Sequence, residues 1–218
     1  MPTRPTVLCR ADDLHVVETP RLWVVTSRAT DYLRWYRLSI DDPLISGDWR
    51  PEEIETIRRE VTLDPIADPI DSEQPLLPVK PNELFFAGID RRTRHLVANI
   101  SATTDKRGAT NVGGAVHRDY RGQGYGHEML SMVCHLLHRH FGYERLEAGC
   151  EITNQASRRW LTGAGFTETT AGDPTHTMPN GRIIQTYRFV YIDHDYELRC
   201  RRPRPAPPRR RFGFLRRD

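Results

Sequence analysis

The sequence has no long apolar run and few cysteines. In a chain of 218 residues, of which 28% are charged, no stretch approaches the ~20 consecutive apolar residues of a membrane-spanning helix. The first residues show no apolar core followed by small residues, so a secretory signal is not expected. The four cysteines are far apart and have no CxxC spacing, which argues against a zinc ribbon or a disulfide framework. Together these features favour a reduced, cytoplasmic location.

Net positive charge is absent outside one segment. The chain carries a formal net charge of +3, yet residues 199–218 hold nine arginines and one aspartate, which leaves −5 for residues 1–198. Four prolines in that segment disfavour helix and packed core, so residues 199–218 are predicted to be a disordered tail. Such a block of like charge is either simply solvated or a handle for polyanions such as nucleic acid or an anionic membrane surface. We expect an N-terminal arm at 1–18 and one domain at 19–198.

The domain alternates strand and helix patterns. Strand patterns are predicted at 21–25, 84–90, 95–103, 111–117 and 145–152, and helices at 30–40, 51–61, 124–141 and 155–163. Asn180–Gly181 is typical of a hairpin turn before a last strand at 182–192. The proline-rich stretch 62–83 is predicted to be a long loop. Because hairpins occur at both ends of this pattern, an α/β fold with a mixed sheet is favoured over a fully parallel one.

The most informative segment is glycine-rich and lies between a predicted strand and helix, at Gly113–Leu130. A helix that begins at such a loop directs several backbone N–H groups and the positive end of its dipole at one point. Glycines without Cβ atoms let a bulky anion approach the backbone. The segment therefore predicts a pyrophosphate site.

Glycine spacing distinguishes the ligands that such a loop could hold. No Lys-Ser or Lys-Thr follows the glycines, as a P-loop requires, and the spacing is GxGxG where a dinucleotide fingerprint needs GxGxxG. The remaining pattern is [RQ]xxGx[GA], formed by Arg121, Gly124 and Gly126. This pattern resembles the coenzyme A loop of the GNAT superfamily of N-acetyltransferases. A second block, Asn154 and Ser157 before a helix that closes on Gly165–Phe166, is similar to the superfamily's next motif.

The resemblance covers about residues 19–192. Within the superfamily, the sequence is similar to the branch that acetylates N-terminal amines of ribosomal proteins. It implies a mostly antiparallel central sheet of six to seven strands, flanked by helices and splayed at an acetyl-CoA cleft. It also implies the binding residues for acetyl-CoA: Gly114, Ala115 and Val116 along the pantetheine, Arg121, Gly122, Gln123, Gly124, Tyr125 and Gly126 on the pyrophosphate, and Asn154 on the pantetheine arm. An N–H near Val116 would polarise the thioester carbonyl.

Ser157 is the catalytic residue that the resemblance implies, as the proton donor to the departing thiolate. Both motif residues also have ordinary structural interpretations, Asn154 as a helix N-cap and Ser157 as a first-turn serine. The superfamily's commoner tyrosine position falls on Leu161, which excludes a tyrosine acid there. No general base is assigned, since the strand before the loop carries no acid. Glu147 and Glu151 alternate away from the apolar side of their strand, and His117 is a weak candidate for a proton relay.

No metal site is predicted. His135 and His138 stand near Cys134 but have no accompanying carboxylate, and histidines in a last helical turn are ordinary dipole partners. The favoured function is direct acetyl transfer from acetyl-CoA to a primary amine, either a protein N-terminus or a small molecule. The alternative is a non-catalytic coenzyme A-binding module that uses its basic tail to associate with RNA, ribosome or membrane. The oligomeric state is open, with a homodimer as one option.

Overall fold

A computed structural model describes residues 6–11, 14–27, 29–47, 51–61, 63, 82–171, 174–178, 181–192 and 200–201. The tail beyond residue 201 and nearly all of the predicted loop at 62–83 lie outside these residues. Within the described part of the chain, no helix is long and apolar enough to cross a membrane.

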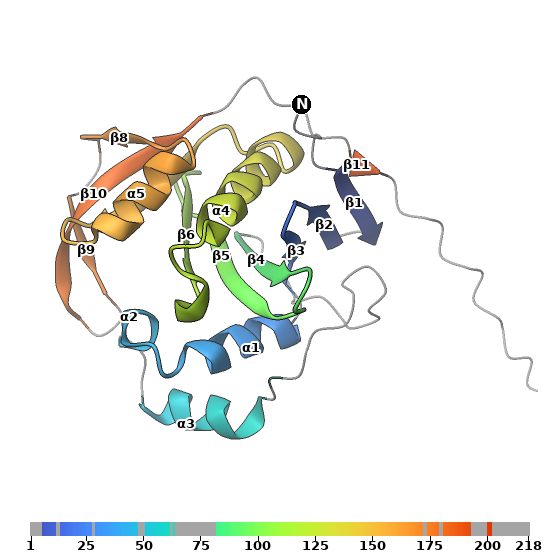
Figure 1. The fold of residues 1–218 in the computed structure, drawn as a ribbon. Coiled ribbons are helices and arrows are strands. Elements are labelled where there is room, and N and C mark those ends of the chain that lie inside the picture. The colour runs from blue at the N-terminus through green and yellow to red at the C-terminus, as the bar shows by residue number, and fades with distance from the viewer. Residues whose placement is uncertain are drawn as a thin grey trace, which may run out of the picture.

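One mixed sheet of eleven strands forms the centre of the fold (Figure 1). Its order is β11-β1-β2-β3-β4-β5-β6-β7-β10-β8, with β9 paired to β10. Neighbouring strands are antiparallel except in the pairs β1–β11 and β6–β7. In chain order the strands are β1 Thr6–Ala11, β2 Leu14–Glu18, β3 Leu22–Thr26, β4 Glu83–Asp90, β5 Leu96–Thr104, β6 Thr110–Val116, β7 Leu146–Glu151, β8 Thr167–Thr169, β9 Thr175–Thr177, β10 Ile183–Tyr191 and β11 Cys200–Arg201.

The helices are α1 Ala29–Ser39, α2 Pro43–Ser46, α3 Pro51–Glu60, the 3₁₀ turn η1 Arg118–Tyr120, α4 Tyr125–His135, the π-helical turn η2 Leu136–His140 and α5 Gln155–Gly163. Each predicted helix is present. The predicted helix at 124–141 is α-helical only as far as His135 and continues as the π-turn, before Gly142 turns the chain at a φ of +76°.

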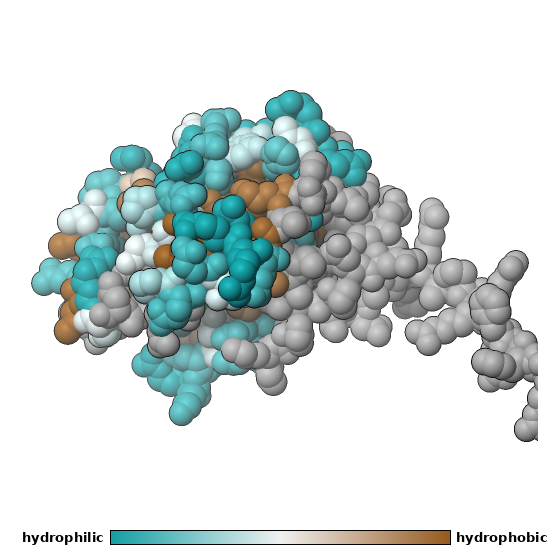
Figure 2. All heavy atoms as spheres, turned by 90° about the horizontal axis from the view of Figure 1, so that it is seen from below, coloured by the Kyte–Doolittle hydropathy of each residue, from teal (hydrophilic) through white to brown (hydrophobic). Residues whose placement is uncertain are grey.

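Helices cover both faces of the sheet. On one face α4, η2 and α5 pack over the central strands through a large apolar cluster that includes Met129, Leu137 and Phe166. On the other face α1 contributes Trp35 to a smaller cluster with Trp23 and Ile89. Figure 2 shows the face seen from below Figure 1, where hydrophilic side chains cover most of the described residues and brown apolar patches lie between them.

The predicted fold class is confirmed, with more strands than the six to seven expected. The sheet is longer because both edges are extended. Residues 6–11 and 14–18, from the segment expected to be an arm outside the domain, form β1 and β2 and pair with each other and with β3. Residues 200–201 of the expected tail pair with β1. At the other edge β8 and β9 add two short strands beside β10.

Candidate functional site

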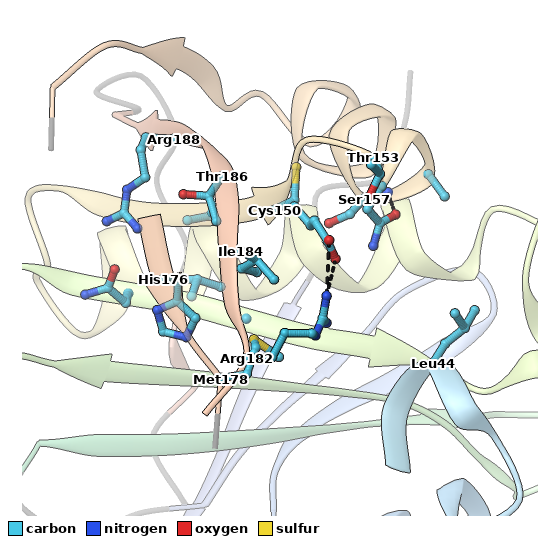
Figure 3. Close-up of a pocket in the computed structure, with 18 of the residues that line it drawn as sticks. Leu44, Cys150, Thr153, Ser157, His176, Met178, Arg182, Ile184, Thr186 and Arg188 are labelled. Atoms are coloured by element: carbon cyan, nitrogen blue, oxygen red, sulfur yellow. Dashed lines mark hydrogen bonds and ion pairs between the residues drawn. The ribbon is translucent and has the colours of Figure 1, made fainter. Parts of the chain in front are cut away.

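The parallel strands β6 and β7 separate soon after they meet. Only two residue pairs join them, Thr110 with Leu146 and Asn111 with Glu147, although both strands continue for several residues. A cleft of about 1510 Å³ opens where they diverge. Its walls are the middle of β6, the second half of β7, the start of α5, the β9–β10 hairpin and α2 (Figure 3). The splayed sheet that the sequence implied is therefore present.

The glycine loop enters α4 through two residues in the left-handed region. Gly122 has a φ of +73° and Gly124, the N-cap of α4, a φ of +85°. No side chain in the described part of the chain caps this helix end, so its first N–H groups are not satisfied by a cap. Gly122, Gln123 and Gly124 are all exposed, and a Cβ on Gly122 would meet nothing within 4 Å. An anion can therefore reach the backbone here, where the helix dipole favours it.

An arginine from β3's N-terminal flank holds this loop in place. The Arg21 guanidinium donates to the Gln123 carbonyl at 2.6 Å, pairs with Glu128 of α4 at 2.7 Å and lies 4.4 Å from the centre of the Tyr125 ring. Its Nη2 would be 3.1 Å from a Cβ on Gly124. The contact places a fixed positive charge directly beside the loop.

Glu128 is the anchor of this clamp. It accepts from the Thr19 hydroxyl at 2.5 Å and from the Arg21 backbone N–H at 2.9 Å. Burial alone would raise the pKa of Glu128, but the hydrogen bonds from Thr19 and Arg21 outweigh it and hold the pKa below the usual 4.5. The carboxylate therefore remains charged at neutral pH and keeps Arg21 in position.

Tyr125 fastens the other side of the loop. Its hydroxyl donates to the Asp90 carboxylate at 2.6 Å, at the end of β4. This hydrogen bond to Asp90 raises the pKa of Tyr125, with burial adding to the effect. Tyr125 therefore stays a neutral donor, and its side chain is engaged inside the fold. A role on the pyrophosphate would fall to its backbone.

Two of the predicted glycines have packing reasons to be glycine. A Cβ on Gly114 would lie 2.2 Å from the Asn99 carbonyl oxygen of β5. One on Gly126 would lie 3.0 Å from Val116 and 3.1 Å from the Trp160 indole nitrogen. These residues let β5, β6, α4 and α5 approach closely, a requirement independent of any ligand.

The Arg121 side chain points into the fold. Its Nε donates to the Val116 carbonyl at 2.9 Å, and its guanidinium pairs with Asp42. Asp42 is the N-cap of α2 and accepts from the Leu44 N–H. Arg121 thus ties the loop to α2, one wall of the cleft. The sequence suggested that its guanidinium adds charge at the phosphates, but in the structure the guanidinium is engaged with Asp42.

The second motif reaches the cleft. Asn154 is the N-cap of α5, since its Oδ1 accepts from the Ser157 N–H at 2.9 Å, and both residues line the cleft. Capping leaves the Asn154 side-chain NH₂ available to a ligand. The Ser157 hydroxyl contacts the Cys150 thiol; burial raises the pKa of that thiol, and the hydrogen bond with Ser157 lowers it by less. Of the predicted residues, Asn154 and Ser157 line the cleft, whereas Gly114–Val116 and the glycine loop are not part of its described lining.

The proton-transfer candidates separate in space. Glu151 lines the cleft and pairs with Arg182 at 3.2 Å, while Glu147 pairs with Arg145 at 3.0 Å. His117 borders a separate pocket of about 230 Å³ beside α1 and is not part of the described lining of the cleft. Burial, opposed by Asp119, lowers the pKa of His117. Among the described residues no group of three or more histidine, cysteine, aspartate or glutamate side chains could hold a metal ion.

Residues 21–167 match the model of the acetyltransferase (GNAT) domain. The chain belongs to the GNAT acetyltransferase family. Acetyl transfer is the reaction of this family. The match begins at the clamp residue Arg21 and extends beyond α5, so it includes the glycine loop, the divergence of β6 and β7, and the Asn154–Ser157 motif.

Solved GNAT structures share this fold. The ribosomal-protein-S5-alanine acetyltransferase from Vibrio fischeri aligns with a TM-score of 0.59 and 13% identity, over 84% of this chain and 98% of its own. RimL, a ribosomal L7/L12 α-N-protein acetyltransferase in complex with coenzyme A, aligns with a TM-score of 0.57 and 13% identity, over 85% of this chain and 97% of its own. A spermidine N-acetyltransferase from Vibrio cholerae aligns with a TM-score of 0.56 and 12% identity, over 80% of this chain and 95% of its own. No curated protein matches the chain in sequence.

Sequence reasoning missed the clamp of this GNAT domain. Arg21 and Glu128 are 107 residues apart, and Asp90 and Tyr125 are 35 apart, so no local spacing announces either contact. The one available signal was Glu128, an acidic residue in the first turn of α4. Its position indicated an interaction with the helix dipole and gave no indication of an arginine from another strand.

Proposed function

We propose that the protein is an acetyl-CoA-dependent N-acetyltransferase that transfers an acetyl group directly from the thioester to a primary amine. The observation that carries the proposal is the divergence of β6 and β7 beside an uncapped helix N-terminus with open glycines. One feature offers unpaired strand edges to the pantetheine amides, and the other offers N–H groups to a pyrophosphate.

The residues present fit the cosubstrate. The pyrophosphate would lie on the backbone of Gly122–Gly126, near the Arg21 guanidinium. The pantetheine would run along Gly114–Val116, and the Asn154 side-chain NH₂ would donate to one of its carbonyls. A backbone N–H near Val116 would polarise the thioester carbonyl.

The transfer itself needs three proton movements. The neutral amine nitrogen attacks the thioester carbon, the C–N bond forms, the C–S bond breaks, and the thiolate of coenzyme A leaves. Ser157 donates a proton to that sulfur, and its place in the cleft beside Cys150 supports this role. The ammonium group first loses one proton to water or to Glu151, the carboxylate that faces the cleft within the described lining. After the attack, the nitrogen gives up a second proton to Ser157, which restores the serine hydroxyl and leaves a neutral amide.

The acceptor is a primary amine, and the fold neighbours do not choose among such amines. By their names, structures of comparable similarity act on ribosomal proteins and on spermidine. A thiol-release assay of the full chain with acetyl-CoA and a panel of amines tests the proposal. Release of coenzyme A together with an acetylated amine supports the enzyme. Tight coenzyme A binding with no turnover of any amine would make the chain a binding module.

A further inference from the structure

The cleft wall formed by the β9–β10 hairpin carries more basic than acidic side chains. Arg188, Arg182 and His176 line this wall, and Glu151 is the single carboxylate among the cleft residues that the structure describes (Figure 3). Residues 1–198 together carry a net charge of −5. The local charge at the cleft therefore differs in sign from that of the body.

The two arginines are in different states. Arg182 pairs with Glu151, where a single guanidinium nitrogen lies 3.2 and 3.4 Å from the two carboxylate oxygens. Among the described residues, the one ion pair of Arg188 is a long contact, 3.7 Å, with Glu147, and that carboxylate already accepts from Arg145 at 3.0 Å. Arg188 therefore retains guanidinium donors, and its side chain is only 24% exposed. A largely buried guanidinium with spare donors is a strong site for a carboxylate.

A glycine beneath Arg188 makes room for this arrangement. Arg188 pairs in register with Gly149 of β7, and its Nη1 would lie 3.3 Å from a Cβ at that position. Ala148 and Cys150 face the helices, so Gly149 and Arg188 lie on the opposite face, next to the gap. Neighbouring strands are about 4.8 Å apart, so the guanidinium lies within one strand spacing of the gap through which the acetyl group must pass.

We propose that Arg188 binds a carboxylate on the acceptor, so that the enzyme prefers primary amines carrying a carboxylate close to the nitrogen. The inference rests on the proposed function and names its substrate class. Two sources share this chemistry, a free amino acid and the N-terminus of a peptide with an acidic residue near its start. Polyamines lack the carboxylate and would meet an arginine in its place.

Matched acceptors test the preference in the full-length protein. The first pair is alanine and alaninamide, with rates expressed per free amine. The second pair is Ala-Glu-Ala and Ala-Gln-Ala, both amidated at the C-terminus so that the glutamate supplies the only carboxylate. Turnover gives kcat/KM, and calorimetric titration of the same peptides into protein saturated with coenzyme A gives affinity without chemistry. Spermidine is the cationic arm.

Two variants separate Arg188 from general charge. Arg188→Gln removes the guanidinium and keeps a hydrogen-bonding side chain. Arg145→Gln is the control, since Arg145 contacts the same Glu147 but does not line the cleft. We expect wild type and Arg145→Gln to prefer the acidic member of at least one pair by about tenfold, which corresponds to ~1.4 kcal/mol. We expect the ratio to fall to about twofold or less in Arg188→Gln.

The outcomes distinguish this inference from the proposed function. Equal use of both members of each pair by wild type, or a preference that survives in Arg188→Gln, overturns the carboxylate site while leaving the acetyltransferase intact. A preference for alanine alone identifies a free amino acid, and a preference for the glutamate peptide identifies an acidic N-terminus. Tighter binding of the acidic peptide with no acetylation of any amine supports the Arg188 site and refutes the enzyme.

Discussion

Replacing Gly124 with aspartate tests the pyrophosphate site directly. The new carboxylate would stand at the uncapped N-terminus of α4, where the bound diphosphate is expected, and its Cβ would approach the Arg21 guanidinium at 3.1 Å. Two unit charges about 5 Å apart repel by ~3 kcal/mol at an effective dielectric constant of about 20. A share of that repulsion is offset because the aspartate can pair with Arg21. We therefore expect the Kd for acetyl-CoA to rise by ~30- to 100-fold.

Gly124→Asn is the matched control. Asparagine has the same shape without the charge, and both residues tolerate the φ of +85° better than other side chains do. The backbone strain, ~1 kcal/mol, is therefore shared by the two variants and cancels between them. Calorimetry with acetyl-CoA at two salt concentrations measures the difference, and thermal melts confirm that both variants fold. Equal affinity in the Asp and Asn variants would show that no phosphate lies beside this residue.

Three further predictions concern other parts of the molecule. Ser157→Ala should lower kcat and leave the calorimetric Kd for acetyl-CoA nearly unchanged, whereas a wild-type kcat would make Ser157 structural. Glu128→Gln should cost ~1–2 kcal/mol of stability at neutral pH in urea unfolding. Because the folded pKa of Glu128 lies below 4.5, its contribution is present above that pH and is lost as the pH falls through the folded value, so the variant should show a flatter acid limb; an unchanged limb would contradict the clamp. Truncation after residue 201 should leave the melting temperature unchanged and weaken salt-sensitive binding to polyanions, and a clear melting drop would show that the tail packs on the domain.

The sequence predicted the local elements well because their signals are local. Local strand patterns located β4 to β7 to within one residue at each end, and the Asn154 cap with its following helix was placed correctly. The edge strands β1 and β2 were not predicted. Their short apolar stretches become strands by pairing with each other and, through β2, with β3, which is a tertiary effect on a weak propensity.

The site was predictable in part for the same reason. Glycine spacing and the Asn-x-x-Ser block indicated a loop and a cap that depend on neighbouring residues. Other features depend on contacts between distant strands and helices: the direction of the Arg121 side chain, the Arg21–Glu128 clamp and the position of Arg188 over Gly149. No periodicity encodes those contacts, so a structure was needed to find them.

The early divergence of β6 and β7 leaves the sheet with two edges in its interior. On the cleft side, alternate backbone groups of β6 beyond Asn111 have no strand partner, while β5 continues to pair with β6 as far as Val116. Amide hydrogen exchange should therefore follow a period of two along β6, with slow amides facing β5 and fast ones facing the cleft. A molecule that occupies the gap as a substitute strand would slow the fast set alone. The same measurement would report occupancy of the gap residue by residue, without any turnover.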